Sequence, residues 1–157
     1  MKQKAPPSPI YIPVPVFYLA FFCFSLLAER EYSFGIKGLR TDAGIYTGCF
    51  LIAAGAALNI VAWIQFIRTH TTISPFKPAN HLQTGGVYTF SRHPMYIGLF
   101  IAYIGATFIW GNWWTLIVLP FLILVIDLYV VKREEKILRR RFGHPYKAYK
   151  KSVKRWF

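Results

Sequence analysis

Four long apolar blocks, separated by short polar segments, are the feature that most constrains what this chain can fold into. They cover residues 10–27, 45–67, 95–110 and 113–131. Because a helix rises about 1.5 Å per residue, about 20 residues cross the roughly 30 Å hydrocarbon core of a bilayer. The second and fourth blocks are long enough by themselves, whereas the first and third need flanking residues or a locally thinner bilayer. The sequence therefore predicts an all-α integral membrane protein with about four transmembrane helices.

The chain of 157 residues is expected to form a single membrane domain over residues 1–157, with its first two spans inside residues 10–67. Only Gly111 and Asn112 separate the third and fourth blocks, which predicts a tight helical hairpin. Hydrophobic residues make up 55% of the chain, and they come in blocks rather than at amphipathic spacing. A soluble helical core, the alternative, would show the amphipathic pattern.

The net charge of +13 raises the question of a nucleic-acid partner, but the distribution of charge indicates a membrane topology instead. With four spans, 16 of the 19 Lys and Arg residues lie on one side of the membrane. The positive-inside rule then places both termini in the cytosol. Contact with anionic lipid headgroups accounts for the basic surface without nucleic acid. We favour a bacterial inner membrane over the endoplasmic reticulum as the location.

The N-terminal region gives no convincing cleavable signal, because Pro13 and Pro15 interrupt the first apolar block and no small-residue cleavage site closes it. Cys23 and Cys49 both fall in expected spans, so two free thiols are predicted. The four histidines have neither paired spacing nor a cysteine companion, and no metal site is expected.

The C-terminal region is predicted to form two further helices. The fourth block continues into KREEKILRRRFG, where Gly143 is a plausible helix C-cap and Pro145 can open a new helix. Beyond it, apolar and aromatic residues recur at helical spacing among lysines, namely Tyr146, Tyr149, Val153 and Trp156. This pattern indicates an amphipathic cytosolic helix at the membrane interface, either as a plain anchor or as a lid over a site.

The segment Arg92-His93-Pro94 lies where a polar loop enters the third apolar block. Pro94 suits the first turn of a helix, and it pushes His93 out of helical geometry so that the ring lies beyond the helix end. Free N–H groups at such a terminus favour an anion. The alternative is that Arg92 binds lipid phosphate and His93 only caps the helix.

Three acidic residues stand out on the basic side of the membrane. Asp127, Glu134 and Glu135 share one helix face with Val131 by their i, i+4, i+7, i+8 spacing. The two glutamates either receive a cationic ligand group or form salt bridges with neighbouring Lys and Arg residues. Asp127 is costly inside an apolar block unless it faces a polar interior, and a hydrogen bond to Asn59 is one structural alternative.

Small residues recur on one face of the second and third blocks, and they predict close helix packing. They include Gly48 and Gly55 in the second block, and Gly98, Ala102 and Gly105 in the third. A second interpretation of Gly98 is that it leaves room for a ligand at the helix mouth. The Gly85-Gly86 pair is more typical of a turn than of a binding loop.

The C-terminal half resembles a known family. The segments GGVYTFSRHPMYIG and REEKILRRRFGHPYKAYKKSVKRW are similar to the signature of the integral-membrane isoprenylcysteine carboxyl methyltransferase and phospholipid methyltransferase superfamily. The similarity covers residues 78–157, which the resemblance marks as a cofactor-binding methyltransferase core. It implies S-adenosylmethionine as methyl donor at the cytosolic ends of the last two spans. The implied cofactor contacts are Gly85, Tyr88, His93, Pro94, Tyr96, Gly98, Glu134 and Glu135.

The resemblance further implies methyl transfer to a lipophilic acceptor, either a prenylcysteine carboxylate or a lipid, with His93, Glu134 and Arg92 as catalytic residues. For a carboxylate acceptor, opposite charges vanish in the transition state, so a dry and well-positioned site is sufficient. An amine acceptor requires a base, and His93 or a glutamate is then the candidate. Two alternatives are an NADPH-dependent membrane reductase of the sterol reductase type and a non-enzymatic membrane scaffold.

Overall fold

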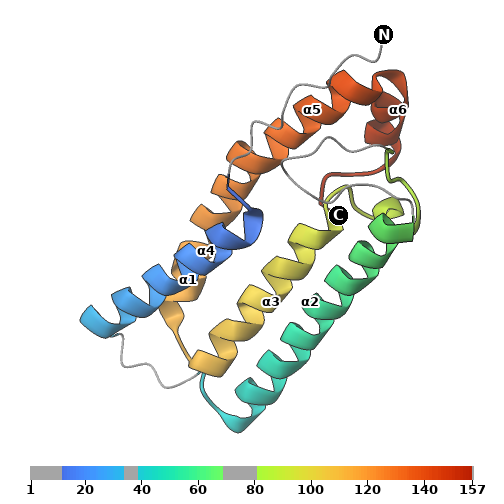
Figure 1. Cartoon of the computed structure of the whole chain (residues 1–157). Helices are drawn as coiled ribbons and strands as arrows, with labels where there is room; N and C mark the ends of the chain where they lie inside the picture. The colour runs from blue at the N-terminus through green and yellow to red at the C-terminus, as the bar shows by residue number, and fades with distance from the viewer. Residues whose placement is uncertain (1–11, 34–38, 69–80, 157) are drawn as a thin grey trace.

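The computed structural model describes residues 12–33, 39–68 and 81–156, and all regular structure in these segments is helical (Figure 1). The long helices of the bundle are α1 (Val14–Glu31), α2 (Asp42–Arg68), α3 (Pro94–Trp110) and α4 (Trp113–Val125). The remaining elements are the 3-10 helix η1 (Gly86–Thr89), the π-helical turn η2 (Ile126–Val131), α5 (Lys132–Phe142) and α6 (His144–Ser152). The prediction of an all-α protein is confirmed.

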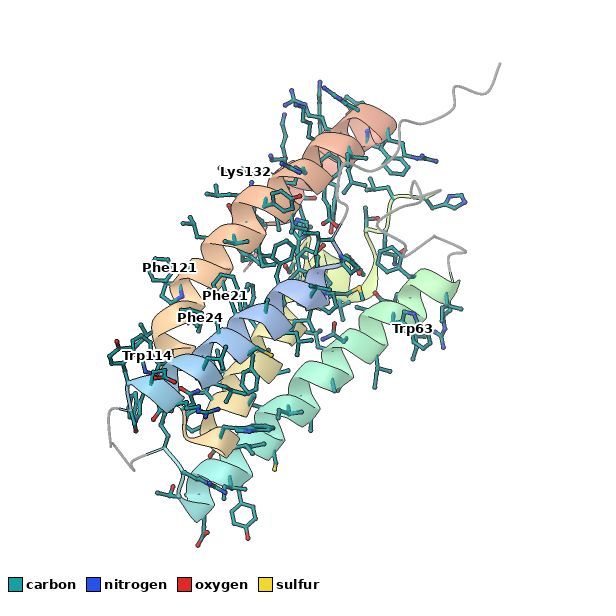
Figure 2. The ribbon with its side chains drawn as sticks, turned by 60° about the vertical axis from the view of Figure 1, so that its left-hand side comes forward. Phe21, Phe24, Trp63, Trp114, Phe121 and Lys132 are labelled. Carbon is teal, nitrogen blue, oxygen red and sulfur yellow. The ribbon has the colours of Figure 1, made fainter. Side chains whose placement is uncertain are left out.

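Two of the described helices are long and apolar enough to cross a membrane. They are Asp42–Arg68 and the continuous helix Trp113–Phe142, which joins α4, η2 and α5, while Pro94–Trp110 is apolar but shorter. The apolar part of the long helix ends at Val131, because α5 carries eight charged side chains among its 11 residues. Large apolar side chains point outward from the bundle, among them Trp63 and Phe121, which are 51% and 61% exposed (Figure 2). Such a surface suits a protein in contact with lipid.

The long helices run up and down in alternation, with α2 packed on α3 and α1 packed on α4 (Figure 1). Glycines make the α2–α3 contact very close. A Cβ atom added to Gly48 would lie 2.6 Å from the Gly105 carbonyl oxygen, and one added to Gly105 would lie 2.7 Å from that of Gly48. Gly55 and Gly98 face each other about two turns further along the same contact. The predicted small-residue packing surface is therefore present.

The predicted hairpin between the third and fourth spans is also present. Gly111 has a φ of 68°, which favours glycine, and its N–H donates to the Thr107 carbonyl at 2.8 Å. Asn112 then caps α4 by accepting from the Trp114 N–H at 2.8 Å. Its side-chain amide also donates to the Ser25 carbonyl of α1 at 3.0 Å, so one residue ends the turn and joins it to a third helix.

The apolar stripe of α6 faces protein rather than lipid. Tyr146 is 1% exposed and Tyr149 8% exposed, and both pack with Val153 against Ala62 of α2 and Tyr88 of η1. The Tyr149 hydroxyl donates to the Tyr88 carbonyl at 2.7 Å. The plain anchor interpretation is therefore wrong in this respect, because a helix that buries its apolar face against the bundle cannot offer that face to the bilayer. The position of α6 agrees with a covering element at this end of the bundle.

Candidate active site

His93 occupies the N-cap of α3, directly before Pro94, with the non-helical backbone that the proline predicts (φ −132°, ψ 54°). Its ring stacks on Tyr96, with 5.5 Å between the ring centroids and 6° between the ring planes. His93 is 7% exposed, and its Nε2 atom has no hydrogen-bond partner among the described residues. Burial lowers the pKa of His93 to about 4, so the imidazole is neutral at pH 7.

Glu134 stands beside this ring. Its Oε1 atom accepts a hydrogen bond of 2.7 Å from the Tyr96 hydroxyl, and its Oε2 atom lies 3.7 Å from His93 Nδ1. The side chain keeps 29% exposure. Burial raises the pKa of Glu134 to about 7, although the Tyr96 hydroxyl acts in the opposite direction. The site therefore holds a neutral imidazole and a carboxyl group that titrates near neutral pH, a combination suited to proton transfer.

Glu135, the next residue, has a different environment. Its carboxylate accepts from Arg92 Nη1 at 2.6 Å, from Lys150 Nζ at 2.9 Å, and from Arg155 Nε and Nη2 at 3.0 and 3.2 Å. The side chain is 8% exposed. Burial by itself would raise the pKa of Glu135, but the donors and cations around it lower the pKa to about 2. Both oxygens of Glu135 are thus already bonded to cations of the chain.

Asp127 also pairs with the C-terminal residues. Arg155 Nη1 donates to both of its carboxylate oxygens, at 3.0 and 3.1 Å. The suggested hydrogen bond to Asn59 is wrong, since Asn59 donates to the Gly55 carbonyl of its own helix at 2.9 Å. Because one guanidinium bonds both Asp127 and Glu135, the prediction that these acids share a helix face is supported. The intervening η2 is a π-helical turn, a feature frequent at functional sites.

Three other predicted cofactor contacts, Tyr88, Gly85 and Gly98, lie in different surroundings. Tyr88 is buried beside α6 and Phe66, and Gly85 is exposed at the N-cap of η1. Gly98 faces α2, where an added Cβ would overlap the Asn59 side chain. Helix packing therefore accounts for Gly98 without a ligand. A wide hollow beside α6, lined by residues such as Thr84, Thr89 and Ser152, includes none of the predicted site residues.

Sequence reasoning missed the residues that close the site from the C-terminal side. Trp156 packs on His93 and on Phe100, with 5.8 Å between the ring centroids in each case. Ser91, Lys150 and Arg155 were not predicted as site residues either. The sequence did contain a signal for these cations. Eleven Lys and Arg residues follow the fourth block, and Asp127 and the two glutamates are the acids near them in the sequence, so some of these cations are expected to pair with the acids.

Comparison with known proteins identifies the family of this chain. A profile described as phospholipid methyltransferase matches residues 43–145, about two thirds of the chain. The chain belongs to the phospholipid methyltransferase family. The matched region spans α2 to the start of α6 and so includes His93 and both glutamates. The resemblance drawn from the RHP segment and the Glu pair is confirmed.

Similar curated proteins extend this finding beyond the family profile. The Saccharomyces cerevisiae protein-S-isoprenylcysteine O-methyltransferase is 31% identical over 151 residues, covering 87% of this chain and 61% of the yeast protein. Its Schizosaccharomyces pombe namesake is 25% identical, over 82% of this chain and 59% of that protein. An uncharacterised Haemophilus influenzae protein is 36% identical over 62 residues, which is 40% of this chain and 98% of that protein.

This member of the phospholipid methyltransferase family therefore spans about three fifths of the length of the two yeast proteins. No solved structure matches the chain. The preference for a bacterial inner membrane finds no support in these relatives, because the two that cover most of the chain come from yeasts. Membrane localisation itself agrees with the two long apolar helices.

Proposed function

We propose that this chain transfers a methyl group from S-adenosylmethionine to a lipophilic acceptor at the cytosolic face of a membrane. In this proposal α1 to α4 all span the bilayer and both termini are cytosolic. The observation that carries the proposal is the buried His93, whose unpartnered Nε2 lies in the same site as the titratable Glu134, within a family of methyltransferases. A prenylated carboxylate is the favoured acceptor, because two relatives bear the name of isoprenylcysteine methyltransferases.

The residues present fit a cofactor that carries both charges and polar hydroxyl groups. Two buried nitrogens, Arg92 Nε and His93 Nε2, have no hydrogen-bond partner among the described residues, and a polar ligand would satisfy them. Glu134 has an oxygen that no hydroxyl or N–H of the described chain bonds, and it suits an ammonium or a ribose hydroxyl. The N-terminus of α3 favours the carboxylate end of an amino acid.

S-adenosylmethionine supplies an activated methyl group on a sulfonium, so the protein needs no nucleophile of its own. The work of the chain is then to position the reactants and to exclude water. Arg92 and Glu135 hold the loop before α3 against α5, and Tyr96 holds Glu134. If the acceptor carries a proton, neutral His93 is placed to take it, because its unpartnered Nε2 offers a lone pair when the ring hydrogen is on Nδ1.

The two glutamates take different roles in this proposal. Glu134 contacts the cofactor, because its carboxylate is half-buried and has a single hydrogen-bond donor among the described residues. Glu135 positions Arg92 instead, because Arg92, Lys150 and Arg155 already occupy it. Gly85, Tyr88, Pro94 and Tyr96 remain proposed neighbours of the cofactor, whereas Gly98 serves the α2–α3 contact.

Calorimetry of the detergent-purified protein tests the proposal directly. S-adenosylmethionine should bind, and labelled methyl groups should then pass to prenylcysteine analogues or to a membrane lipid fraction. Binding of NADPH alone would contradict the methyltransferase proposal and support a reductase of the sterol reductase type. Binding of neither cofactor would favour a membrane scaffold that retains the fold.

A further inference from the structure

The last described residues of the chain lie against the loop that carries His93. α6 ends at Ser152, and its C-cap Val153 has an extended backbone (φ −121°, ψ 130°), so the residues from Val153 on must be held by contacts outside the helix. We call residues 153–156 the C-terminal strap. The sequence predicted Val153 and Trp156 as part of an amphipathic helix that is either an anchor or a lid over a site, but no residue of the strap was among the predicted site residues.

The backbone of the strap is bonded to the His93 loop at two successive residues. The Arg92 N–H donates to the Lys154 carbonyl at 3.2 Å. The Ser91 hydroxyl donates to the Arg155 carbonyl at 3.0 Å, and the same hydroxyl oxygen accepts from the His93 N–H at 3.2 Å. The Ser91 hydroxyl therefore bridges the Arg155 carbonyl of the strap and the backbone N–H of His93.

The Arg155 guanidinium fixes the strap from the other side. It bonds Asp127 of η2 and Glu135 of α5 at the same time, through four N–H···O contacts of 3.0 to 3.2 Å. Such forked, charge-assisted bonds have a defined geometry that the single ammonium of a lysine cannot reproduce. Arg155 is 28% exposed at its side chain, so these bonds are partly shielded from water.

The strap ends on the His93 ring itself. The Trp156 indole packs on His93 and on Phe100, so the imidazole contacts two aromatic side chains, Tyr96 and Trp156. Trp156 belongs to the apolar cluster around Tyr103 and Ile126, which joins the strap to the core of the bundle. With Trp156 removed, one wall of the His93 site would be open.

We propose that the C-terminal strap is a positioning element, in which Arg155 holds the Trp156 indole against the His93 ring and so keeps the ring oriented and dry. The consequence for methyl transfer rests on the proposed function, whereas the placement of His93 does not. Water would otherwise reach the imidazole, which faces Arg92 of its own loop, Glu134 and Glu135 of α5, Asp127 of η2 and Arg155 of the strap.

Chemical footprinting of histidine tests the proposal without any cofactor. Diethyl pyrocarbonate acylates accessible neutral imidazoles, and peptide mass spectrometry gives the rate at each histidine. In the wild-type protein in detergent, His93 should react slowly, whereas the exposed His81 and His144 serve as internal standards. We expect Trp156→Ala and Arg155→Ala to raise the His93 rate about tenfold with the two standards unchanged. Trp156→Phe, which retains an aromatic ring, should stay near the wild-type rate.

Two further variants keep the test decisive. Lys154→Ala is the matched control, because the exposed Lys154 side chain makes no hydrogen bond or ion pair with the described residues, whereas its carbonyl accepts from the Arg92 N–H. It should leave the His93 rate unchanged. Arg155→Lys retains the charge and an intact core, and it should raise the rate about threefold because one ammonium cannot bond both acids. Wild-type His93 rates in Arg155→Lys and Trp156→Ala would overturn the proposal, as would a Lys154→Ala rate equal to that of Arg155→Ala.

Kinetics separate this inference from the proposed function. If wild-type protein binds S-adenosylmethionine, Arg155→Lys and Trp156→Ala should lower the methyl-transfer kcat more than they raise the KM of the acceptor. Trp156→Phe should keep most of the wild-type kcat, unlike Trp156→Ala. Failure of wild-type protein to bind S-adenosylmethionine would remove the proposed function and leave the footprinting result intact. Full binding with an unprotected wild-type His93 would remove the inference alone.

Discussion

Two contacts between distant segments hold this molecule together, and they work by different physical means. Along α2 and α3, Gly48, Gly55, Gly98 and Gly105 let two backbones touch, so the contact depends on the absence of side chains. At the end of the bundle where α3 begins, the carboxylates of Glu135 and Asp127 bond Arg92, Lys150 and Arg155, which come from three other segments. The first contact depends on shape, and its glycines have no side chain that could bind a ligand or transfer a proton. The second depends on charge, and it borders the buried His93.

The same contrast recurs within one pair of neighbours on α5. Glu135 is bonded to three cations and is 8% exposed, whereas Glu134 accepts one hydroxyl hydrogen bond and is 29% exposed. Adjacent residues on a helix point about 100° apart, so one faces the cation cluster and the other faces His93. Identical chemistry in the sequence thus serves structure at one position and, in our proposal, binding at the next.

The largest effect is expected from Glu135→Gln. This change leaves the buried Arg92 without its carboxylate, and breaking such a buried pair costs about 3–5 kcal/mol of unfolding free energy. Chemical unfolding in detergent measures the loss. Glu134→Gln is the matched control, with the same change of group one residue away, and it should not lower the unfolding free energy, because burial already favours the uncharged form of this side chain. Equal losses in both variants would contradict the division of roles.

A smaller loss is expected from Gly55→Ala in the shape-dependent contact. The added Cβ would overlap the Gly98 carbonyl oxygen on α3, and overpacking of this kind costs about 1–3 kcal/mol. Ala56→Leu, on the exposed side of the same helix, is the control. Thermal unfolding in detergent should rank Gly55→Ala well below both the control and the wild type. An unchanged melting temperature would show that the helices can separate without cost.

Ligand binding should sharpen the contrast between the glutamates. Glu134→Gln and His93→Ala should each weaken S-adenosylmethionine binding about tenfold, since a hydrogen bond to a charged group contributes about 1.5–3 kcal/mol. Neither change should prevent folding of the detergent-stable protein. Lys136→Ala, an exposed neighbour on α5, should bind as the wild type does. Calorimetry gives these affinities, and wild-type values in both site variants would assign the residues to topology or lipid contact.

The smallest effect is the pH dependence of stability between pH 4.5 and 7. The pKa of His93 falls from 6.5 to about 4 on folding, so the unfolded chain binds the extra proton and this group loses stability as pH falls. The pKa of Glu134 rises from 4.5 to about 7, so the native state binds the extra proton and this group gains stability as pH falls.

Melting temperatures across this pH window separate the two contributions. On acidification, the stability of the His93→Gln variant should fall less than that of the wild type. The stability of the Glu134→Gln variant should fall more than that of the wild type. The side chain of Glu135, whose pKa drops to about 2, contributes mainly below pH 4.5 and serves as the internal reference. Slopes that change in the same direction for both variants would contradict the opposite environments of the two groups.

The helices were predictable because membrane helices are specified locally. Apolar blocks, Pro94 at a helix start and the Gly111-Asn112 turn each act over a few residues, and all three predictions match the described helices. The glycine contact was predictable for the same reason, since Gly48 and Gly55 share a face of one helix. The role of α6 was only partly predictable. Its amphipathic spacing shows that one face is buried, but spacing does not say whether lipid or protein covers that face.

The sequence by itself determined the helical architecture, the hairpin and the candidate RHP and Glu-Glu segments, because these follow from hydropathy, helical periodicity and a recognisable motif. Only the tertiary structure decided which glutamate is occupied, which cation occupies it and that Trp156 lies on His93. Eleven cations follow the fourth block, and several could reach the three acids by sequence alone. Pairing among charges depends on distances between helices that are remote in the chain, and those distances are set by packing rather than by local sequence.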